Sequence, residues 1–143
     1  MNTLVDTSVW SLALRRHPKD LSAAEQSVVG ELADLTREGR ARIIGLIRQE
    51  LLAGIRTPAQ HEKLRVALRA FPDEPIDASD YEGAAGASNA CRARGIAASL
   101  VDVLICQIAI SREWSIFTTD PDFKNYAKAL PLMLHAPDAI SGK

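Results

Sequence analysis

The sequence predicts an α/β fold, a three-layer sandwich whose central, mostly parallel sheet has about four or five short strands. Short apolar segments bounded by polar residues alternate with segments whose apolar residues recur at helical spacing. This alternation is typical of parallel strands joined by right-handed helical crossovers. No internal repeat or low-complexity linker divides the 143 residues, and this length suits one core. We therefore expect a single domain over residues 1–143.

The first half of the chain predicts two strands and four helices. Pro18 keeps the polar, basic turn over 15–20 out of any helix. Ser22 and Glu25 have the spacing of a capping box, and Gly39 ends the helix that they begin. In chain order we expect a strand at 4–5, a helix at 9–14, the helix capped by Ser22, a strand at 42–44, and helices at 47–54 and 59–70.

The second half predicts three further helices and up to three strands. Gly95 has the position of a C-terminal glycine after a long Ala-rich helix. Ser99 caps a strongly periodic helix that carries Val101, Leu104 and Ile108. In chain order we expect a poorly defined strand at 75–77, a helix at 79–94, the helix capped by Ser99, a strand at 114–118, a short helix at 123–129 and a last strand at 132–134.

Composition is that of an ordinary globular protein, with 47% apolar and 24% charged residues. The net charge of −1 excludes a global field that would draw the chain to nucleic acid or anionic lipid. Cys91 and Cys106 lie in helix-like segments without a CxxC pair, so we expect a reducing compartment and no disulfide. The sequence has no signal peptide and no apolar run of membrane-spanning length. We expect a cytoplasmic protein with no membrane partner.

Two acidic residues stand at the carboxyl tips of predicted strands. Asp6 follows the first strand, and Asp120 follows the strand at 114–118. Ligands of open parallel sheets bind beyond this edge. Each residue also has an ordinary interpretation, because Asp6 could cap the next helix and Asp120 could belong to an Asp-Pro turn or cap the last helix. Taken singly, these two residues leave both interpretations open.

Two more acids lie on apolar helix faces. Asp102 shares a face with Ile105 and Cys106, so its carboxylate tops an apolar stripe. A carboxylate in that position needs a cation or strong hydrogen-bond donors. Glu50 has a similar setting beside Ile47. The alternatives are that Asp102 supports the first turn of its helix and that Glu50 pairs on the surface with a neighbouring arginine.

Together, the four acids predict a metal site. A parallel sheet places strand tips and the starts of the following helices at one edge. Several carboxylates there repel one another unless a cation neutralises them. Oxygen ligands without histidine or cysteine favour Mg²⁺ or Mn²⁺ over zinc. Such a cation, held among carboxylates and substrate phosphates, suits the hydrolysis of phosphodiester bonds.

Four short motifs in chain order carry a family resemblance. They are Leu4-Val5-Asp6-Thr7-Ser8, Glu50-Leu51-Leu52-Ala53-Gly54, the segment from Gly95 through Ser99 to Ile105, and Thr118-Thr119-Asp120-Pro121-Asp122-Phe123. With this order and spacing, the chain resembles PIN-domain ribonucleases, and in its short form the VapC toxins of toxin–antitoxin pairs. It departs from the expected pattern at Cys106, where a small Ala is usual, and at 45–48, where hydroxyl residues often precede the Glu.

The resemblance implies a PIN-like fold and Mg²⁺-dependent endoribonuclease activity, as the toxin of a type II toxin–antitoxin pair. It implies that a four-carboxylate site binds one or two Mg²⁺ or Mn²⁺ ions and catalyses the hydrolysis of RNA. It also implies a small antitoxin that blocks the acidic pocket, and a homodimer. The residues expected to be catalytic and to bind metal are Asp6, Glu50, Asp102 and Asp120, and the accessory candidates are Thr118, Asp122 and Ser8.

Several features remain open to other interpretations. The arginines at 15, 16, 48, 92 and 94 are candidates for contacts with the RNA backbone, or they serve solubility. Trp10 and its apolar neighbours belong to the core or to a dimer interface. The alternative functions are a Mg²⁺ phosphatase of the haloacid-dehalogenase type and a non-catalytic binding module. The phosphatase motif requires a second Asp at the position of Ser8. It also requires a later Lys, and no Lys of this sequence is well placed for that role.

Overall fold

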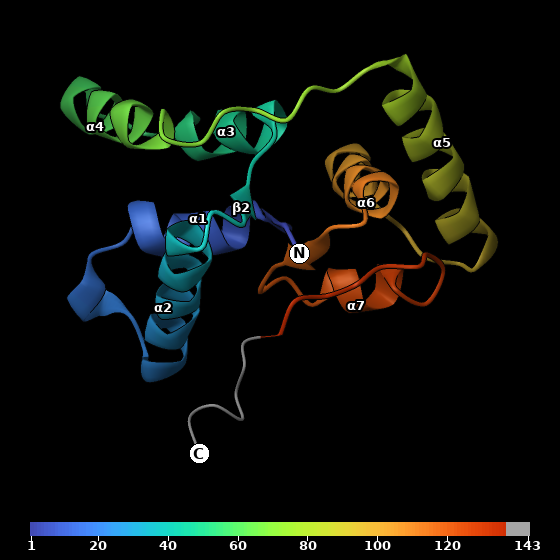
Figure 1. Cartoon of the computed structure of the whole chain (residues 1–143), viewed down its shortest axis with the longest axis horizontal. Coiled ribbons are helices and arrows are strands. Elements are labelled where there is room, and N and C mark those ends of the chain that lie inside the picture. The colour runs from blue at the N-terminus through green and yellow to red at the C-terminus, as the bar shows by residue number, and fades with distance from the viewer. Residues whose placement is uncertain (137–143) are drawn as a thin grey trace.

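A parallel sheet of three strands lies at the centre of the computed structural model, which describes residues 1–136 (Figure 1). The strands are β1 (Thr3–Val5), β2 (Ala41–Arg42) and β3 (Ser115–Phe117), in the order β2-β1-β3. Leu4 of β1 is paired with Arg42 on one side and with Ile116 on the other. β1 is therefore the central strand, which is why its three residues are all fully buried.

Helices cover the sheet in two groups, which confirms the α/β sandwich. Figure 1 shows α1 to α4 on one side of the strands and α5 to α7 on the other. The helices are α1 (Thr7–Leu14), the 3-10 turn η1 (Pro18–Asp20), α2 (Ala23–Arg37), α3 (Gly45–Leu52), α4 (Pro58–Leu68), α5 (Ala78–Ala93), α6 (Leu100–Arg112) and α7 (Asp122–Tyr126). In the described part of the chain, none of them is long and apolar enough to cross a membrane.

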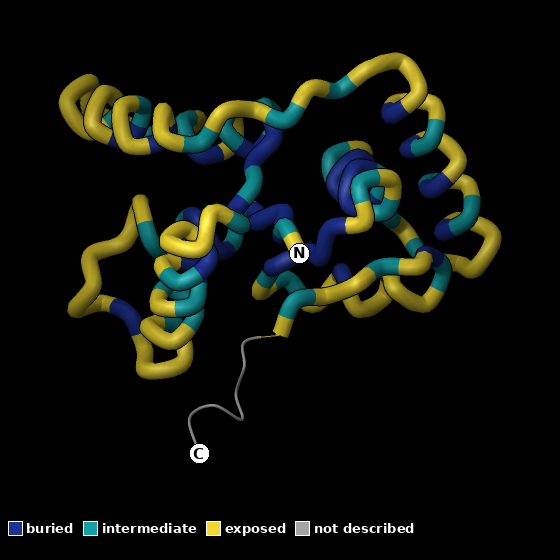
Figure 2. The backbone as a smooth tube through the Cα atoms, in the orientation of Figure 1, coloured by how far each residue is buried: buried dark blue, intermediate teal, exposed yellow. Residues whose placement is uncertain are grey.

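The core lies between these helices and the sheet, where Figure 2 shows the buried stretches. Trp10 of α1 is 1% exposed, and its indole N–H donates to the carbonyl of Val5 at 2.9 Å. Its ring packs edge-on against Phe71, with ring centroids 4.7 Å apart. Val9 and Leu12 are buried as well. The apolar face of α1 therefore belongs to the core and leaves only Leu14, 36% exposed, as an apolar surface residue of this helix.

Local sequence signals set several of the helix boundaries. Ser22 and Glu25 form the expected capping box. Ser99 Oγ accepts the backbone N–H of Asp102 at 3.0 Å. Gly39 and Gly95 follow their helices with positive φ angles of 69° and 73°, a conformation that a side chain disfavours. The predicted caps and end glycines are thus in place.

The sheet is narrower than predicted. The expected strand at 75–77 is wrong, because Asp77 caps α5 and forms a second capping box with Asp80. The chain touches the sheet slightly earlier, in a single parallel bridge between Asp73 and Ile43. The expected last strand at 132–134 is likewise reduced to one bridge, between Leu134 and Ile116. Apolar or extended residues at both edges therefore pair at one position each and do not form full strands.

Arg112, at the end of α6, binds the start of α5 and the residues just before it. Its guanidinium donates to Asp80 Oδ1 at 2.6 Å and Oδ2 at 3.0 Å, to Glu74 at 2.8 Å and to the carbonyl of Pro75 at 2.8 Å. Asp80 is only 5% exposed. The hydrogen bonds and charge of Arg112 hold the pKa of this carboxyl below its usual range. This cluster joins both helices on one side of the sheet.

Candidate metal centre

The tips of β1 and β3 are tied together by hydroxyl groups. Ser8 Oγ and Thr118 Oγ1 both donate to Asp6 Oδ2, at 2.9 and 2.8 Å. The two hydroxyls in turn accept backbone N–H groups, Ser8 from Thr119 and Thr118 from Asp120, each at 3.0 Å. Asp6 is 7% exposed, and its Oδ1 accepts no hydrogen bond from the described residues. The site therefore fixes one oxygen of Asp6 and leaves the other available.

Asp6 does not cap α1. It occupies the N-cap position with φ −75° and ψ 157°, but its side chain makes no capping hydrogen bond. The ordinary interpretation of this residue is therefore wrong: its carboxylate turns toward the tip of β3 and away from the free N–H groups of α1.

Asp102 lies in the first turn of α6 with its carboxylate half-buried. The hydroxyl of Tyr126 donates to its Oδ2 at 2.6 Å. The pKa of Asp102 is raised, first by burial and then by the negative charges of Asp6 and Asp120. The hydrogen bonds from Tyr126 and Ser99 oppose this rise without cancelling it. Asp6, Asp102 and Asp120 thus share one electrostatic environment, as their places at the sheet edge predict.

Glu50 reaches the site from α3 and is exposed. Thr7 Oγ1 donates to Glu50 Oε1 at 2.7 Å, so the start of α1 holds this carboxylate. The alternative, a surface pair of Glu50 with Arg48 or Arg56, does not form among the described residues. The guanidinium of Arg48 instead donates to Asp73 at 2.9 Å and to the carbonyls of Leu68, at 3.0 Å, and Phe71. Arg48 is therefore a structural residue.

Asp120 stabilises a turn with its side chain and also lies close enough to Asp102 for its charge to act on that residue. Its Oδ1 accepts the backbone N–H of Asp122 at 2.9 Å, which is the turn that the Asp-Pro sequence predicts. Asp122 is exposed at the start of α7. Its charge contributes, after burial and Asp102, to raising the pKa of Tyr126. Asp122 therefore lies at the margin of this acidic group.

The residues fit a hard cation held partly through water. Among residues 1–136, none of the four predicted acids forms an ion pair with Lys, Arg or His. The side-chain ligands on offer are all oxygen, as Mg²⁺ and Mn²⁺ prefer. No three His, Cys, Asp or Glu side chains of these residues converge closely enough to hold an ion by themselves. Mg²⁺ commonly keeps several of its waters, so it can bind carboxylates that do not all contact the ion directly.

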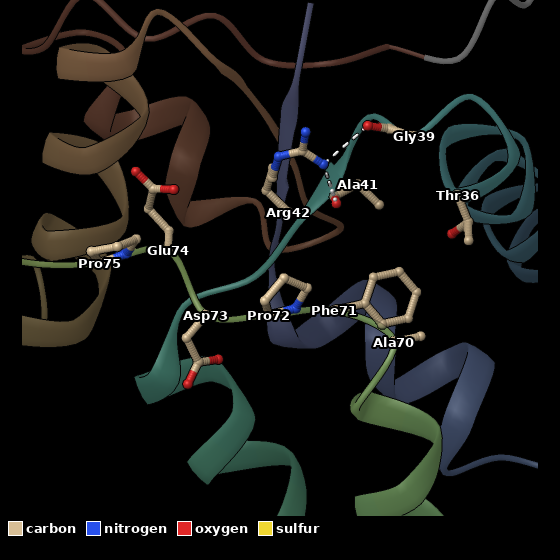
Figure 3. A pocket seen from close by; sticks show the side chains of 10 residues that line it. All are labelled: Thr36, Gly39, Ala41, Arg42, Ala70, Phe71, Pro72, Asp73, Glu74 and Pro75. Carbon is tan, nitrogen blue, oxygen red and sulfur yellow. Dashed lines mark hydrogen bonds between the residues drawn. The ribbon is translucent and has the colours of Figure 1, made fainter.

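A hollow at the β2 edge of the sheet is lined by none of the four predicted acids. It measures about 510 Å³ and lies between β2 and residues 70–75 (Figure 3). Arg42 lines it, and its guanidinium donates to the carbonyls of Gly39 and Ala41, both at 3.0 Å. This hollow is therefore separate from the acidic centre.

A sequence model of the PIN domain matches residues 3–129, which include every acid described above. The chain belongs to the PIN-domain family. A comparison with curated proteins gives no match.

Solved structures share this PIN fold across nearly the whole chain. The FitAcB structure from Neisseria gonorrhoeae has a TM-score of 0.74 and 20% identity, covering 94% of this chain and 97% of the other. The VapBC2 structure from Rickettsia felis, bound to a DNA fragment from its promoter, has a TM-score of 0.72 and 18% identity, covering 94% and 98%. VapBC-1 from nontypeable Haemophilus influenzae has a TM-score of 0.69 and 14% identity, covering 94% and 97%.

The sequence did not predict the roles of two residues whose hydroxyl groups bind acids of the candidate centre. Thr7 stands inside the first motif, but nothing in its spacing shows that its hydroxyl meets Glu50, which is 43 positions away. Tyr126 is buried beside Phe123 on α7 and looks like a core aromatic. The available signal was chemical, since a buried tyrosine hydroxyl needs a hydrogen-bond partner.

Proposed function

We propose that this PIN domain is a Mg²⁺-dependent endoribonuclease and the toxin of a type II toxin–antitoxin pair, acting in the cytoplasm. The observation that carries the proposal is the acidic edge itself. Burial and the negative charges of Asp6 and Asp120 raise the pKa of Asp102, and no cation of the described residues pairs with these three acids. The FitAcB and VapBC structures, and a toxin–antitoxin complex from Klebsiella pneumoniae with a TM-score of 0.62, support the assignment as a toxin.

In this proposal, Asp6, Glu50, Asp102 and Asp120 hold the ion, partly through its waters. When bound, Mg²⁺ would supply an activated water and neutralise charge that develops on the phosphate. The chain's own residues position the ligands. Ser8 and Thr118 fix Asp6, and Tyr126 fixes Asp102. Exposed Glu50, held by Thr7, orients the attacking water and accepts its proton.

Two further roles belong to the proposal. Asp122 is an accessory residue at the margin, where it faces the phosphate backbone or an outer water of the ion. A small antitoxin would inhibit the toxin by covering the acidic edge, where its own basic groups would replace the ion's charge.

Removal of the metal tests the proposed activity. Purified protein incubated with a mixed RNA pool and Mg²⁺ should cleave it, EDTA should stop the cleavage, and added Mn²⁺ should restore it. Products are measured on denaturing gels. A covalent phosphate on Asp6, detected by mass spectrometry, would instead indicate the phosphatase alternative, although Ser8 stands where that class wants a second Asp. Absence of both activities, with no Mg²⁺-induced rise in melting temperature, would favour a binding module.

The homodimer is also a proposal, and its interface is not the face of α1, which is in the core. The most exposed large apolar residue in the described chain is Leu100, at 82%, beside Tyr81, at 56%. Both line a groove of about 410 Å³ between α5, α6 and Leu46 of α3. A second copy would cover this surface. Leu100→Lys is therefore expected to give a monomer in analytical ultracentrifugation at micromolar concentration.

The matched control for this prediction is Val66→Lys on α4, where the apolar side chain is 50% exposed outside the groove. It adds the same charge and should leave the dimer intact. A monomeric wild-type chain, or a Leu100→Lys chain that stays dimeric, would contradict the proposed interface.

A further inference from the structure

A basic groove lies between the end of α1 and α4. It measures about 610 Å³. Its lining residues include Leu14, Arg15, Arg16, His17, Ile55 and Lys63. None of them is acidic, and three carry a permanent positive charge. The groove is therefore a local cationic surface on a chain whose net charge is −1.

The cationic side chains of this groove contribute little to holding the fold together. Arg15 and Lys63 are exposed, and neither forms a hydrogen bond or ion pair through its side chain with another residue of the described chain. Arg16 has only a weak contact of 3.4 Å with the carbonyl of Asp20, and its charge helps to lower the pKa of Glu25. By contrast, Arg48 and Arg112 are each bound to several acceptors.

The groove and the acidic centre lie at the two ends of α1. Thr7 begins α1 and donates to Glu50, while Leu14 ends the same helix and lines the groove. The eight residues of α1 span about 12 Å. Ile55, shortly after Glu50 in the sequence, lines the groove as well. An extended strand of a few nucleotides is long enough to reach from one end of α1 to the other.

Electrostatics favours a polyanion in this groove. The acidic centre repels the phosphates that flank a scissile bond, and a bound metal offsets this charge only locally. Cations a few nucleotides away would supply the missing attraction. Among the lining residues His17 is the only aromatic side chain, so the groove offers phosphate contacts and little base stacking.

We infer that this groove binds the phosphate backbone of single-stranded RNA beside the cleavage site, through Arg15, Arg16 and Lys63. The inference rests on the proposed ribonuclease function and names the path of its substrate. The predicted contribution is independent of base sequence, because the cations meet phosphates and not base edges.

A binding measurement in EDTA tests the groove without cleavage. The ligand is a fluorescent single-stranded RNA of mixed sequence, and the variant is the Arg15→Gln/Arg16→Gln/Lys63→Gln triple. It should bind at least about 10-fold more weakly at 0.1 M salt, and the slope of log K against log salt should fall by about 2. The matched control is Arg37→Gln/Arg69→Gln/Lys128→Gln, which changes net charge equally outside the groove and should bind nearly as wild type does.

Kinetics separates failure of this inference from failure of the proposed function. With Mg²⁺, the triple variant should raise KM for a long RNA and leave cleavage of a trinucleotide unchanged. Equal KM and equal binding for both triple variants, with cleavage intact, would overturn the groove alone. No cleavage by any protein would refute the nuclease, while the binding measurement still decides the groove. Tighter binding of a Glu-rich peptide than of RNA of equal charge would assign the groove to a protein partner and overturn the inference.

Discussion

Asp102→Asn is expected to lower RNA cleavage by about 10³-fold and, at pH 7, to raise the melting temperature of the metal-free protein. The first effect follows because a metal ligand contributes several kcal/mol to stabilising transition-state charge. The second follows because Asp102 is half-buried near Asp6 and Asp120, which raises its pKa. Its charged form is therefore less favourable in the folded than in the unfolded chain. Asn removes that charge and still accepts the hydroxyl of Tyr126.

The pH dependence gives this prediction a sign. Because the folded-state pKa of Asp102 is raised, its charged carboxylate lowers the free energy of unfolding. This loss of stability is absent below the ordinary Asp pKa of about 3.9 and develops as pH rises through the folded-state pKa. The gain in melting temperature of Asp102→Asn over wild type should therefore disappear in acid. Asp122→Asn, at the exposed margin, is the matched control and should change neither quantity greatly. Full activity in Asp102→Asn would exclude the residue from the metal centre.

Asp80→Ala is expected to destabilise the protein by about 3 kcal/mol, because it leaves the partly buried guanidinium of Arg112 without its two-oxygen acceptor. The melting temperature of a chain of this size should fall by roughly 10 °C. Because the pKa of Asp80 is lowered in the folded state, the stability that its charge contributes is present at pH 7 and is lost as pH falls through the folded-state pKa. Thermal unfolding followed by circular dichroism measures both effects.

An exposed ion pair supplies the control for Asp80. Asp34 pairs with Arg37 on the surface of α2, where both side chains are largely solvent-accessible. Asp34→Ala should change stability by no more than about 0.5 kcal/mol. A loss of similar size in the two variants would show that the Arg112 cluster is no more important than a surface pair.

The sequence allowed most of the fold to be predicted because its signals were local. Caps such as Ser22 and Ser99 bind N–H groups three residues away, and glycines such as Gly95 end helices by their own backbone angles. The prediction of a strand at 75–77 was wrong because it also relied on a local signal, and that signal was ambiguous. Pro75 and Ile76 looked extended, but Asp77 meets Asp80 in a capping box that pattern alone did not distinguish from a strand end.

The sequence predicts which acids form the candidate site, but not the hydrogen bonds that orient them. Sheet topology was enough to bring Asp6, Asp102 and Asp120 to one edge. The bonds that orient them join distant residues, such as Thr118 to Asp6 and Tyr126 to Asp102. Such contacts depend on packing angles and side-chain rotamers, which periodicity does not encode.

The bond from Thr118 to Asp6 spans 112 positions. Its consequence is one of timing during synthesis. A growing chain that has reached the end of α6 already contains Asp6, Glu50 and Asp102, but β3 has not yet been made. The central strand then lacks its second neighbour, and Asp6 lacks one of its two hydroxyl donors. Contacts between distant residues also form late in folding, because long loops must close first. The acidic centre can therefore assemble only after nearly all of the chain has been translated.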